Sequence, residues 1–276
     1  MATLLRSGTS PRVGVGDLLR DWRRRRHQSQ LALALEAGVS QRHLSFVESG
    51  RAQASREMLL RLAESLDMPL REQNRLLNAA GFTAVYLERS LDDPALDVAR
   101  HAVERVLAAH EPYPALAVDR RWMLVTANRS VAPLLASASP ELLMPPVNVL
   151  RLSLHPEGLA RSIVNYGQWR SYLLQRLARE CELTGDAHLH QMLEELRGYP
   201  APPPPAVARP AIPQSDARVF IPLQLATPAG VLSFISTTTV FGTSVDVTVA
   251  ELSLECMYPA DAVTAAALRD LVPSDG

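Results

Sequence analysis

Hydrophobic residues recur at helical spacing along the N-terminal part of the chain, with polar residues between them. Ser55 is a suitable N-cap, and Gly81 stands where a helix commonly ends. The pattern predicts five helices: about Gly16–Arg26, two within Ser29–Gly50, one from Ser55 to before Pro69, and one over about 70–80 closing on Gly81. An all-helical domain of this size can form a small core.

The two helices within Ser29–Gly50 are separated by a glycine turn. Gly38 supplies the positive φ that ends the first helix, and Ser40 can cap the second. On the second helix Leu44 and Val47 point inward, because they are three positions apart. The outer face of that helix then carries Gln41, Arg42, Ser45, Phe46 and Ser49.

The rest of the chain mixes helical and strand patterns. After a connector, Asp93 can cap a helix over about 93–109. The segment "PALAVDRRWMLVTAN" predicts two strands, 131–197 is largely helical, and the proline-rich 199–213 is a surface loop or linker. Three strands follow, in "RVFIPLQL", "VLSFISTTTVFG" and "ELSLECMY". The predicted fold class is α+β: a helical domain, then an antiparallel sheet with helices over one face.

The charge is divided unevenly along the chain. Residues 1–82 hold 13 Arg and 8 acidic residues, a balance of +5, and the remainder holds 15 Arg and 21 acidic residues, a balance of −6. A basic first domain indicates a polyanionic partner for that domain alone. No signal-peptide pattern or membrane span is evident, and Cys181 and Cys256 do not form a disulfide framework. We expect a cytoplasmic, nucleoid-associated protein.

An outward-facing Gln and Arg in the first turn of a helix suit the major groove of DNA. Gln41 can pair with adenine and Arg42 with guanine, while Ser45 and Phe46 can contact neighbouring bases. Phosphate contacts are expected from Gln30, Arg23, Arg24, Arg25, Arg26 and Arg51. The alternative is a helical hairpin with a solvated polar face. The basic five-helix context favours a helix-turn-helix that reads double-stranded DNA.

Long motifs carry a family resemblance. "SQLALALEAGVSQRHLSFVESGRA", "AHEPYPALAVDRRWMLVTAN", "VNVLRLSLHPEGL" and "STTTVFGTSVDVTVAEL" resemble XRE-family helix-turn-helix regulators with an MmyB-like ligand-binding domain. The resemblance implies a bacterial transcription regulator with a five-helix, lambda-repressor-like DNA-binding domain and a PAS-like sensor. The expected organisation is a flexible arm (1–12), the helix-turn-helix domain (13–82), a linker (83–95) and the ligand-binding domain (96–272).

The resemblance also implies a small apolar ligand, with a fatty acid as the candidate. Arg151, His155, Asn165 and Trp169 lie in the family motifs and are predicted to hold its head group, with Arg the natural partner of a carboxylate. The alternative is that the strand faces form a filled core and the domain only dimerises or docks a protein partner. We expect a homodimer.

Catalytic and metal chemistry are not indicated. The chain lacks GxSxG, GxxxxGK[ST], HExxH and GxGxxG motifs, so we expect no enzyme activity and no cofactor. His188 and His190 form an HxH, but no second ligand pair completes a metal site.

Overall fold

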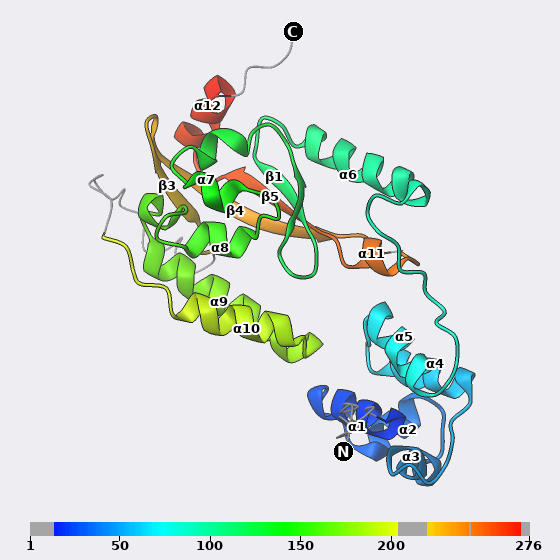
Figure 1. Ribbon diagram of the computed structural model, residues 1–276. Coiled ribbons are helices and arrows are strands. Elements are labelled where there is room, and N and C mark those ends of the chain that lie inside the picture. Colours follow the sequence, from blue (N-terminus) through cyan, green and yellow to red (C-terminus); the bar gives the residue numbers. More distant parts are fainter. Residues whose placement is uncertain (1–13, 204–219, 243, 272–276) are drawn as a thin grey trace, which may run out of the picture. The chain divides into compact units, whose positions relative to one another are not determined.

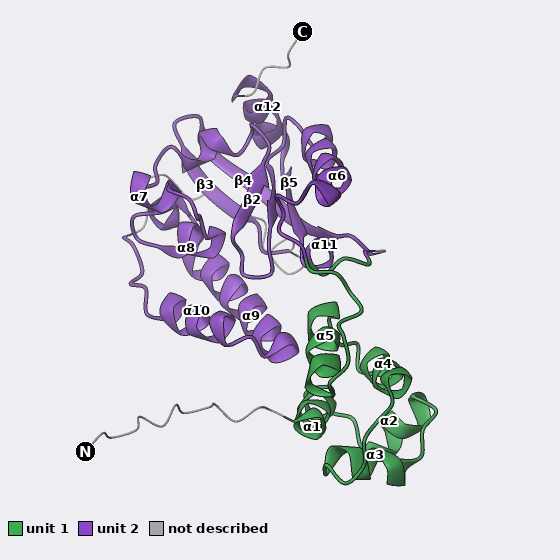
Figure 2. Ribbon diagram, turned by 45° about the vertical axis from the view of Figure 1, so that its right-hand side comes forward, with its two compact units in different colours: residues 1–88, 245–247 green, residues 89–244, 248–276 purple. Residues whose placement is uncertain are grey.

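The computed structural model describes residues 14–203, 220–242 and 244–271. The chain forms two compact units, one of Met1–Glu88 with Val245–Val247 and one of Arg89–Ser244 with Thr248–Gly276 (Figure 2). The expected flexible arm, residues 1–12, lies outside the described residues, as does most of the proline-rich segment.

The first unit contains the five predicted helices. They are α1 (Val15–Arg25), α2 (Gln30–Glu36), α3 (Gln41–Glu48), α4 (Arg56–Ser65) and α5 (Leu70–Ala79). The hydroxyls of Ser40 and Ser55 accept hydrogen bonds from backbone N–H groups of the first helical turns, so both predicted caps are confirmed. Gly38 has φ +64° and Gly81 has φ +83°, the left-handed conformation that a helix-ending glycine adopts.

One hydrophobic core holds these helices together. Trp22, Leu33, Leu44, Leu59 and Leu76 are almost fully buried in it. These residues come from all five helices, so each helix contributes a face to the same core. Leu44 and Val47, which the helical spacing placed on the inner side of α3, are both buried in this core, so that prediction is confirmed.

Gly16 fixes how closely α1 approaches α3. A Cβ atom at this position would lie 2.5 Å from the backbone oxygen of Glu48 and 2.7 Å from that of Val47. Such distances are far below van der Waals contact. Glycine at position 16 is therefore required for the backbone of α1 to pass directly against the end of α3.

The second unit is built on a five-stranded antiparallel sheet (Figure 1). Its strands are β1 (Ala115–Val118), β2 (Leu124–Ala127), β3 (Leu223–Thr227), β4 (Gly230–Val240) and β5 (Ser253–Pro259). Their order in the sheet is β2-β1-β5-β4-β3. The predicted sequence of two strands, a helical middle and three strands is confirmed.

Helices and short turns occupy the rest of this unit. They are η1 (Pro94–Leu96), α6 (Asp97–Ala109), η2 (Ala132–Leu135), α7 (Pro140–Leu143), α8 (Val149–Leu154), η3 (Ala160–Ser162), α9 (Tyr166–Thr184), α10 (Ala187–Arg197), α11 (Val247–Ala250) and α12 (Ala262–Leu271). The long α9 and α10 lie side by side in both views (Figures 1 and 2).

The sheet is covered on both faces rather than on one, which corrects the expectation from sequence. The larger cluster joins Leu116 of β1 to Leu173 and Leu177 of α9. A smaller cluster on the opposite face joins Ala117 of β1 to Val103 of α6. The physical reason is that all four residues of β1 are apolar and buried, so both faces of this strand exclude water.

Strand β3 begins later than the alternating pattern predicted. The sequence pattern extended the strand back through Ile221, but Phe220 and Ile221 are exposed and the ladder starts at Leu223. Pro222 precedes that point and has no N–H to donate to a neighbouring strand. Two further apolar residues, Val106 of α6 and Tyr258 of β5, are exposed.

Candidate functional sites

The outer face of α3 presents the predicted base-reading side chains. Gln41 and Arg42 are exposed, and Ser45 and Phe46 are half-buried behind them. The guanidinium carbon of Arg42 lies 5.4 Å from the centre of the Phe46 ring, within the range of a cation–π contact. Phe46 thus supports the Arg42 side chain on the helix surface.

A buried carboxylate, Glu48, connects three helices behind this face. Arg23 of α1 donates to both oxygens of Glu48, at 2.7 and 2.9 Å, and Gln30 of α2 donates to one of them at 2.8 Å. Arg20 donates to the Glu48 carbonyl oxygen. Burial opposes ionisation of Glu48, but the bonds from Arg23 and Gln30 outweigh it and hold its pKa below the ordinary value.

Two of the arginines expected at phosphates are engaged inside the unit. Arg23 is bound to Glu48 and to the Gln28 carbonyl oxygen, and Arg26 donates to the carbonyl oxygens of Leu66 and Asp67 at 2.8 and 2.7 Å. Both side chains therefore differ from the outward placement that the run of four arginines suggested. The periodicity of the sequence did not indicate that Arg23 would bind Glu48 or that Arg26 would bind the carbonyl oxygens of Leu66 and Asp67.

The remaining predicted phosphate-contacting arginines face solvent. Arg24, Arg25 and Arg51 are exposed, and Arg25 lies 5.3 Å from the ring centre of Trp22. Gln30 is half-buried, and its amide is bound to Glu48, so its position fixes α2 against α3. The unit thus presents exposed positive charge in addition to the polar outer face of α3, and a DNA-binding surface requires both.

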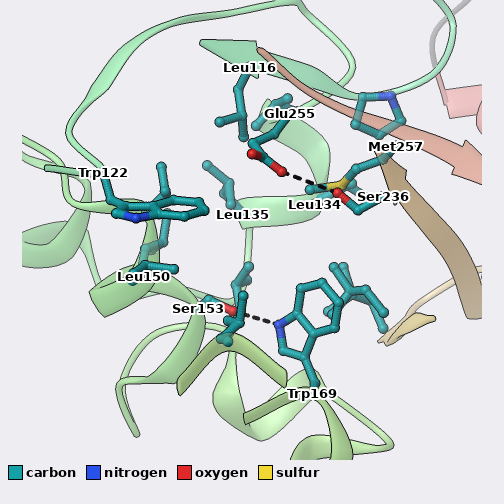
Figure 3. Close-up of a pocket in the computed structure, with 18 of the residues that line it drawn as sticks. Leu116, Trp122, Leu134, Leu135, Leu150, Ser153, Trp169, Ser236, Glu255 and Met257 are labelled. Atoms are coloured by element: carbon teal, nitrogen blue, oxygen red, sulfur yellow. Dashed lines mark hydrogen bonds between the residues drawn. The ribbon is translucent and has the colours of Figure 1, made fainter. Parts of the chain in front are cut away.

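An apolar cavity lies in the second unit, between the sheet and the helices that cover its larger core (Figure 3). Its volume is about 100 Å³. Most of the walls come from strands β1, β2, β3 and β5, the turn between β1 and β2, η2, and helices α8 and α9. Their apolar lining residues are Leu116, Trp122, Leu124, Leu134, Leu135, Val149, Leu150, Leu152, Trp169, Tyr172, Leu173, Leu223, Leu225 and Met257. Such a lining favours apolar guests.

An ion pair between the half-buried Arg176 and the buried Glu255 forms part of one wall. Arg176 of α9 donates to the two oxygens of Glu255 in β5, at 3.2 and 2.7 Å. Ser236 and Thr238 of β4 also donate to Glu255, at 3.3 and 3.0 Å. Although burial disfavours its charge, the contacts with Glu255 raise the pKa of Arg176 above its ordinary value.

Trp122 completes the surroundings of this ion pair. The Arg176 guanidinium carbon lies 4.4 Å from the Trp122 ring centre, and the indole Nε1 donates to Glu180 at 2.7 Å. Glu180 is also 3.4 Å from Arg176, and its burial raises its pKa. Trp122 has φ +63°, an uncommon conformation for a bulky residue, in a turn held by hydrogen bonds to Asp119.

A second polar feature, a hydrogen-bonded pair of side chains, lies on another side of the cavity. The Trp169 indole Nε1 donates to the Ser153 hydroxyl at 3.0 Å. Figure 3 shows this pair apart from Glu255 and Ser236, with apolar side chains between them. The cavity is therefore an apolar space with polar groups at two separate places.

The four predicted head-group residues do not gather around this cavity. Trp169 lines it, whereas Arg151, His155 and Asn165 are absent from its walls. Arg151 is exposed and forms a two-bond pair with Glu195 at 2.8 and 2.7 Å. This corrects the expectation that Arg151 anchors a carboxylate here, because its guanidinium is occupied by Glu195 outside the cavity.

His155 and Asn165 have other partners. The His155 ring packs edge-on against Tyr199, with ring centres 5.0 Å apart. Asn165 is buried and bridges to β3, donating to the Pro222 carbonyl oxygen and accepting from the Gln224 N–H. Asn165 therefore joins the start of α9 to the sheet, and the family motif around it is structural at this position.

The cavity residues that the sequence analysis missed are Arg176, Glu255, Ser236 and Ser153. One sequence signal pointed to Glu255: it is a charged residue within the apolar strand pattern "LSLECMY", on the face opposite Leu254 and Cys256. A charge inside a buried strand normally has a partner. The identity of that partner, Arg176, depends on packing between α9 and the sheet.

Other chemistry has little support among the residues that the structure describes. Cys181 and Cys256 are buried free thiols, and burial raises the pKa of both. Across these residues, no group of three or more His, Cys, Asp or Glu side chains is arranged to hold a metal ion. None of the helices in the described ranges has the length and apolar character needed to cross a bilayer.

Comparisons with known proteins assign both units. Residues 99–271 match the family model of the MmyB-like transcription regulator ligand binding domain, and residues 19–73 match a helix-turn-helix model. No curated protein matches the chain.

Two solved structures are similar to this chain, one over its N-terminal helices and one over most of its length. The restriction-modification controller protein C.AhdI from Aeromonas hydrophila is 34% identical over 22% of this chain and 94% of its own, with a TM-score of 0.21. An RNA-binding light-oxygen-voltage receptor is 13% identical over 93% of this chain, with a TM-score of 0.24. The match spans 60% of the receptor's length.

The helix-turn-helix unit and the sheet domain with its cavity define a DNA-binding transcription regulator with a ligand-binding domain. The chain belongs to the family of regulators that carry the MmyB-like ligand-binding domain, and its helix-turn-helix is of the XRE type.

Proposed function

We propose that this regulator reads an operator through α3 and changes its affinity for that operator when a small apolar ligand occupies the cavity of the second unit. The observation that carries the proposal is the cavity itself. Its walls are almost wholly hydrocarbon and aromatic, yet they include the Arg176–Glu255 pair. A filled core has no need of such a space, whereas a sensor requires a site for its ligand.

In the DNA-reading step, Gln41 and Arg42 contact base edges, assisted by Ser45 and Phe46. Arg24, Arg25 and Arg51 supply the contacts to phosphate, because their side chains are exposed. Arg23, Arg26 and Gln30 act indirectly by holding α1 and α2 in place. We propose a homodimer that places two α3 helices about one turn of DNA apart, on a near-palindromic site in the bacterial cytoplasm, at the nucleoid.

A fatty-acyl chain is the candidate ligand. Its hydrocarbon part suits the leucine-rich walls, and Trp122 and Trp169 offer flat aromatic surfaces. The volume of about 100 Å³ is below the roughly 300–1,000 Å³ of common ligand pockets. A short chain fits this space, and a longer chain requires η2, whose Leu134 and Leu135 line the cavity and are only half-buried, to shift outward.

The test is native mass spectrometry of the full chain, followed by denaturing extraction of any bound molecule. We expect a species of defined mass that is lost in Leu135→Trp, where the larger side chain fills the cavity. Val263→Trp is the matched control, because Val263 is 72% exposed on α12 and lies outside the cavity. A wild-type protein that stays free of ligand when a panel of acyl compounds is added would refute the proposal.

One observation favours a second function for the same domain. Helix α6 exposes the apolar side chains of Val98 and Val106, at 79% and 42%. Such a face is suited to dimerisation or to docking of a protein partner. A dimer that dissociates in Val98→Asp and binds no ligand would favour this alternative.

A further inference from the structure

We infer that the ligand of this cavity carries an uncharged, hydrogen-bonding head group, such as a hydroxyl or an amide, rather than a carboxylate. The inference rests on the proposed ligand-binding function and specifies its chemistry. Three features of the cavity support it. The charged groups beside the cavity have no net positive charge, the donors of Arg176 are already bound to protein carboxylates, and Ser153 and Ser236 can each form a further hydrogen bond.

The charges beside the cavity do not favour an anion. Among the lining residues, Arg176 and Glu255 are the two that carry charge, +1 and −1. Glu180 lies 3.4 Å from Arg176 on the other side and adds −1, so the three groups sum to −1. Protonation of Glu180, towards which its raised pKa tends, brings the sum only to zero. In neither state does the group present a net positive charge to an anion.

The donors of Arg176 are already committed to protein carboxylates. Two of its nitrogens bond Glu255, the third faces Glu180, and the flat guanidinium rests over Trp122. A ligand carboxylate would have to displace one of these partners and would then lie beside the carboxylate it displaced. It would also lose its own hydration in an apolar space, which is costly for a charge without a counterion.

A neutral polar head group can use the hydrogen-bonding capacity that remains on the two serines of the cavity. The Ser153 hydroxyl accepts from Trp169, and within the described part of the chain no protein acceptor takes its proton. The Ser236 hydroxyl donates to Glu255, which leaves its oxygen able to accept. A hydroxyl or amide can accept from Ser153 or donate to Ser236, and its transfer into the cavity costs far less than that of a charge.

The test measures binding of octanoic acid, octanol, octanamide and octylamine to the full-length protein at neutral pH by isothermal titration calorimetry. We expect the alcohol and the amide to bind at least about tenfold more tightly than the acid, because the unpaired charge is penalised on entry. Equal or tighter binding of the acid, or tightest binding of the amine, overturns the inference and leaves the proposed function standing. Failure of all four compounds to bind overturns both.

A charge-neutralising variant tests the cause of the preference. Glu255→Gln frees Arg176 from its main partner, so the acid should gain affinity relative to the alcohol by about tenfold. Glu195→Gln is the matched control: it removes a carboxylate that pairs with Arg151 outside the cavity and should leave the preference unchanged. An unchanged preference in a folded Glu255→Gln protein refutes the charge argument.

Ser236→Ala gives a second readout, because it leaves the buried charges in place. The alcohol and the amide should bind severalfold more weakly to this variant, and the acid should change little. Equal weakening of all three compounds would contradict the role of the serine as a partner for a neutral head group.

Discussion

At the scale of single residues, Arg42 is the side chain whose placement most directly predicts a measurable effect on DNA. It is exposed on α3 and supported by the Phe46 ring. We expect Arg42→Ala to cost about 1–3 kcal/mol on the specific site and little on random DNA, because a base contact is lost. Fluorescence anisotropy with both DNAs measures the difference.

The matched control for Arg42 is Arg61→Ala, which removes the same charge from an exposed position on α4. Arg61→Ala should have a small effect that is similar on both DNAs. If Arg42→Ala instead weakens binding to the specific site and to random DNA equally, Arg42 contacts phosphate and the reading of bases passes to Gln41.

Residue roles were predictable where they depend on neighbours in sequence. The caps at Ser40 and Ser55 and the positive φ of Gly38 follow from interactions within a few positions. Arg151 and Arg176 show that residue roles set by distant partners cannot be predicted in this way. Both are helix arginines, and only tertiary packing decides that Arg151 binds the half-buried Glu195 while Arg176 binds Glu255, 79 positions away.

At the scale of elements, the contact between α1 and α3 depends on Gly16. Alanine normally favours a helix over glycine by about 1 kcal/mol, so propensity alone predicts that Gly16→Ala stabilises α1. The 2.5 Å approach of its Cβ to the Glu48 carbonyl oxygen reverses the sign, because backbone cannot yield as a flexible side chain does. We expect a loss of about 1–3 kcal/mol in the free energy of unfolding, measured by denaturant titration.

Gly14→Ala is the control for this steric argument. Its Cβ would meet the nearest atom, an oxygen of Asp17, at an ordinary 3.6 Å. The Gly14 variant should therefore unfold at nearly the wild-type denaturant concentration. Comparable losses for both variants would mean that the crossing of α1 and α3 does not need a glycine.

The junction of α1, α2 and α3 also predicts a dependence on pH. The pKa of Glu48 in the folded protein is lowered from 4.5, so its contribution to stability is present above that value and is lost as the pH falls through the lowered pKa. Glu48→Gln should cost about 3 kcal/mol at pH 7, and the difference from wild type should shrink in acid. The indole NMR signal of Trp22, which is buried in this unit, follows the unfolding.

Glu57→Gln provides the comparison for Glu48, because it removes an exposed carboxylate from α4 of the same unit. Its free energy of unfolding should differ little from that of wild type at every pH. A gap between wild type and Glu48→Gln that stays constant from neutral to acid pH would show that the ion pair with Arg23 does not supply the stability.

The sequence predicted whether a segment is a helix or a strand better than it predicted how the helices and strands pack together. Alternation identified the two groups of strands, since each strand contributes its own period. The strand order β2-β1-β5-β4-β3 places β5 between β1 and β4, and this order brings Glu255 beside Ser236 and the cavity. No local pattern encodes that order, so the cavity could be anticipated only through the family resemblance.

At the scale of the whole molecule, ligand and operator must affect each other equally if the proposed function holds. A ligand that changes operator affinity by a given factor requires the operator to change ligand affinity by the same factor. We expect a factor of about 5–150, the common range of such coupling. Titration calorimetry of octanol, with and without saturating operator DNA, measures one side, and anisotropy of operator DNA, with and without octanol, measures the other.

Two controls test whether ligand binding in the cavity is the cause of a change in operator affinity. Leu135→Trp, which fills the cavity, should bind operator with an affinity that octanol no longer changes. Random DNA should alter octanol affinity less than the operator does, because it does not fix the spacing of two α3 helices. Octanol binding that is tight but identical with and without operator would separate the cavity from DNA reading, and the second unit would then bind its ligand for a purpose other than control of the operator.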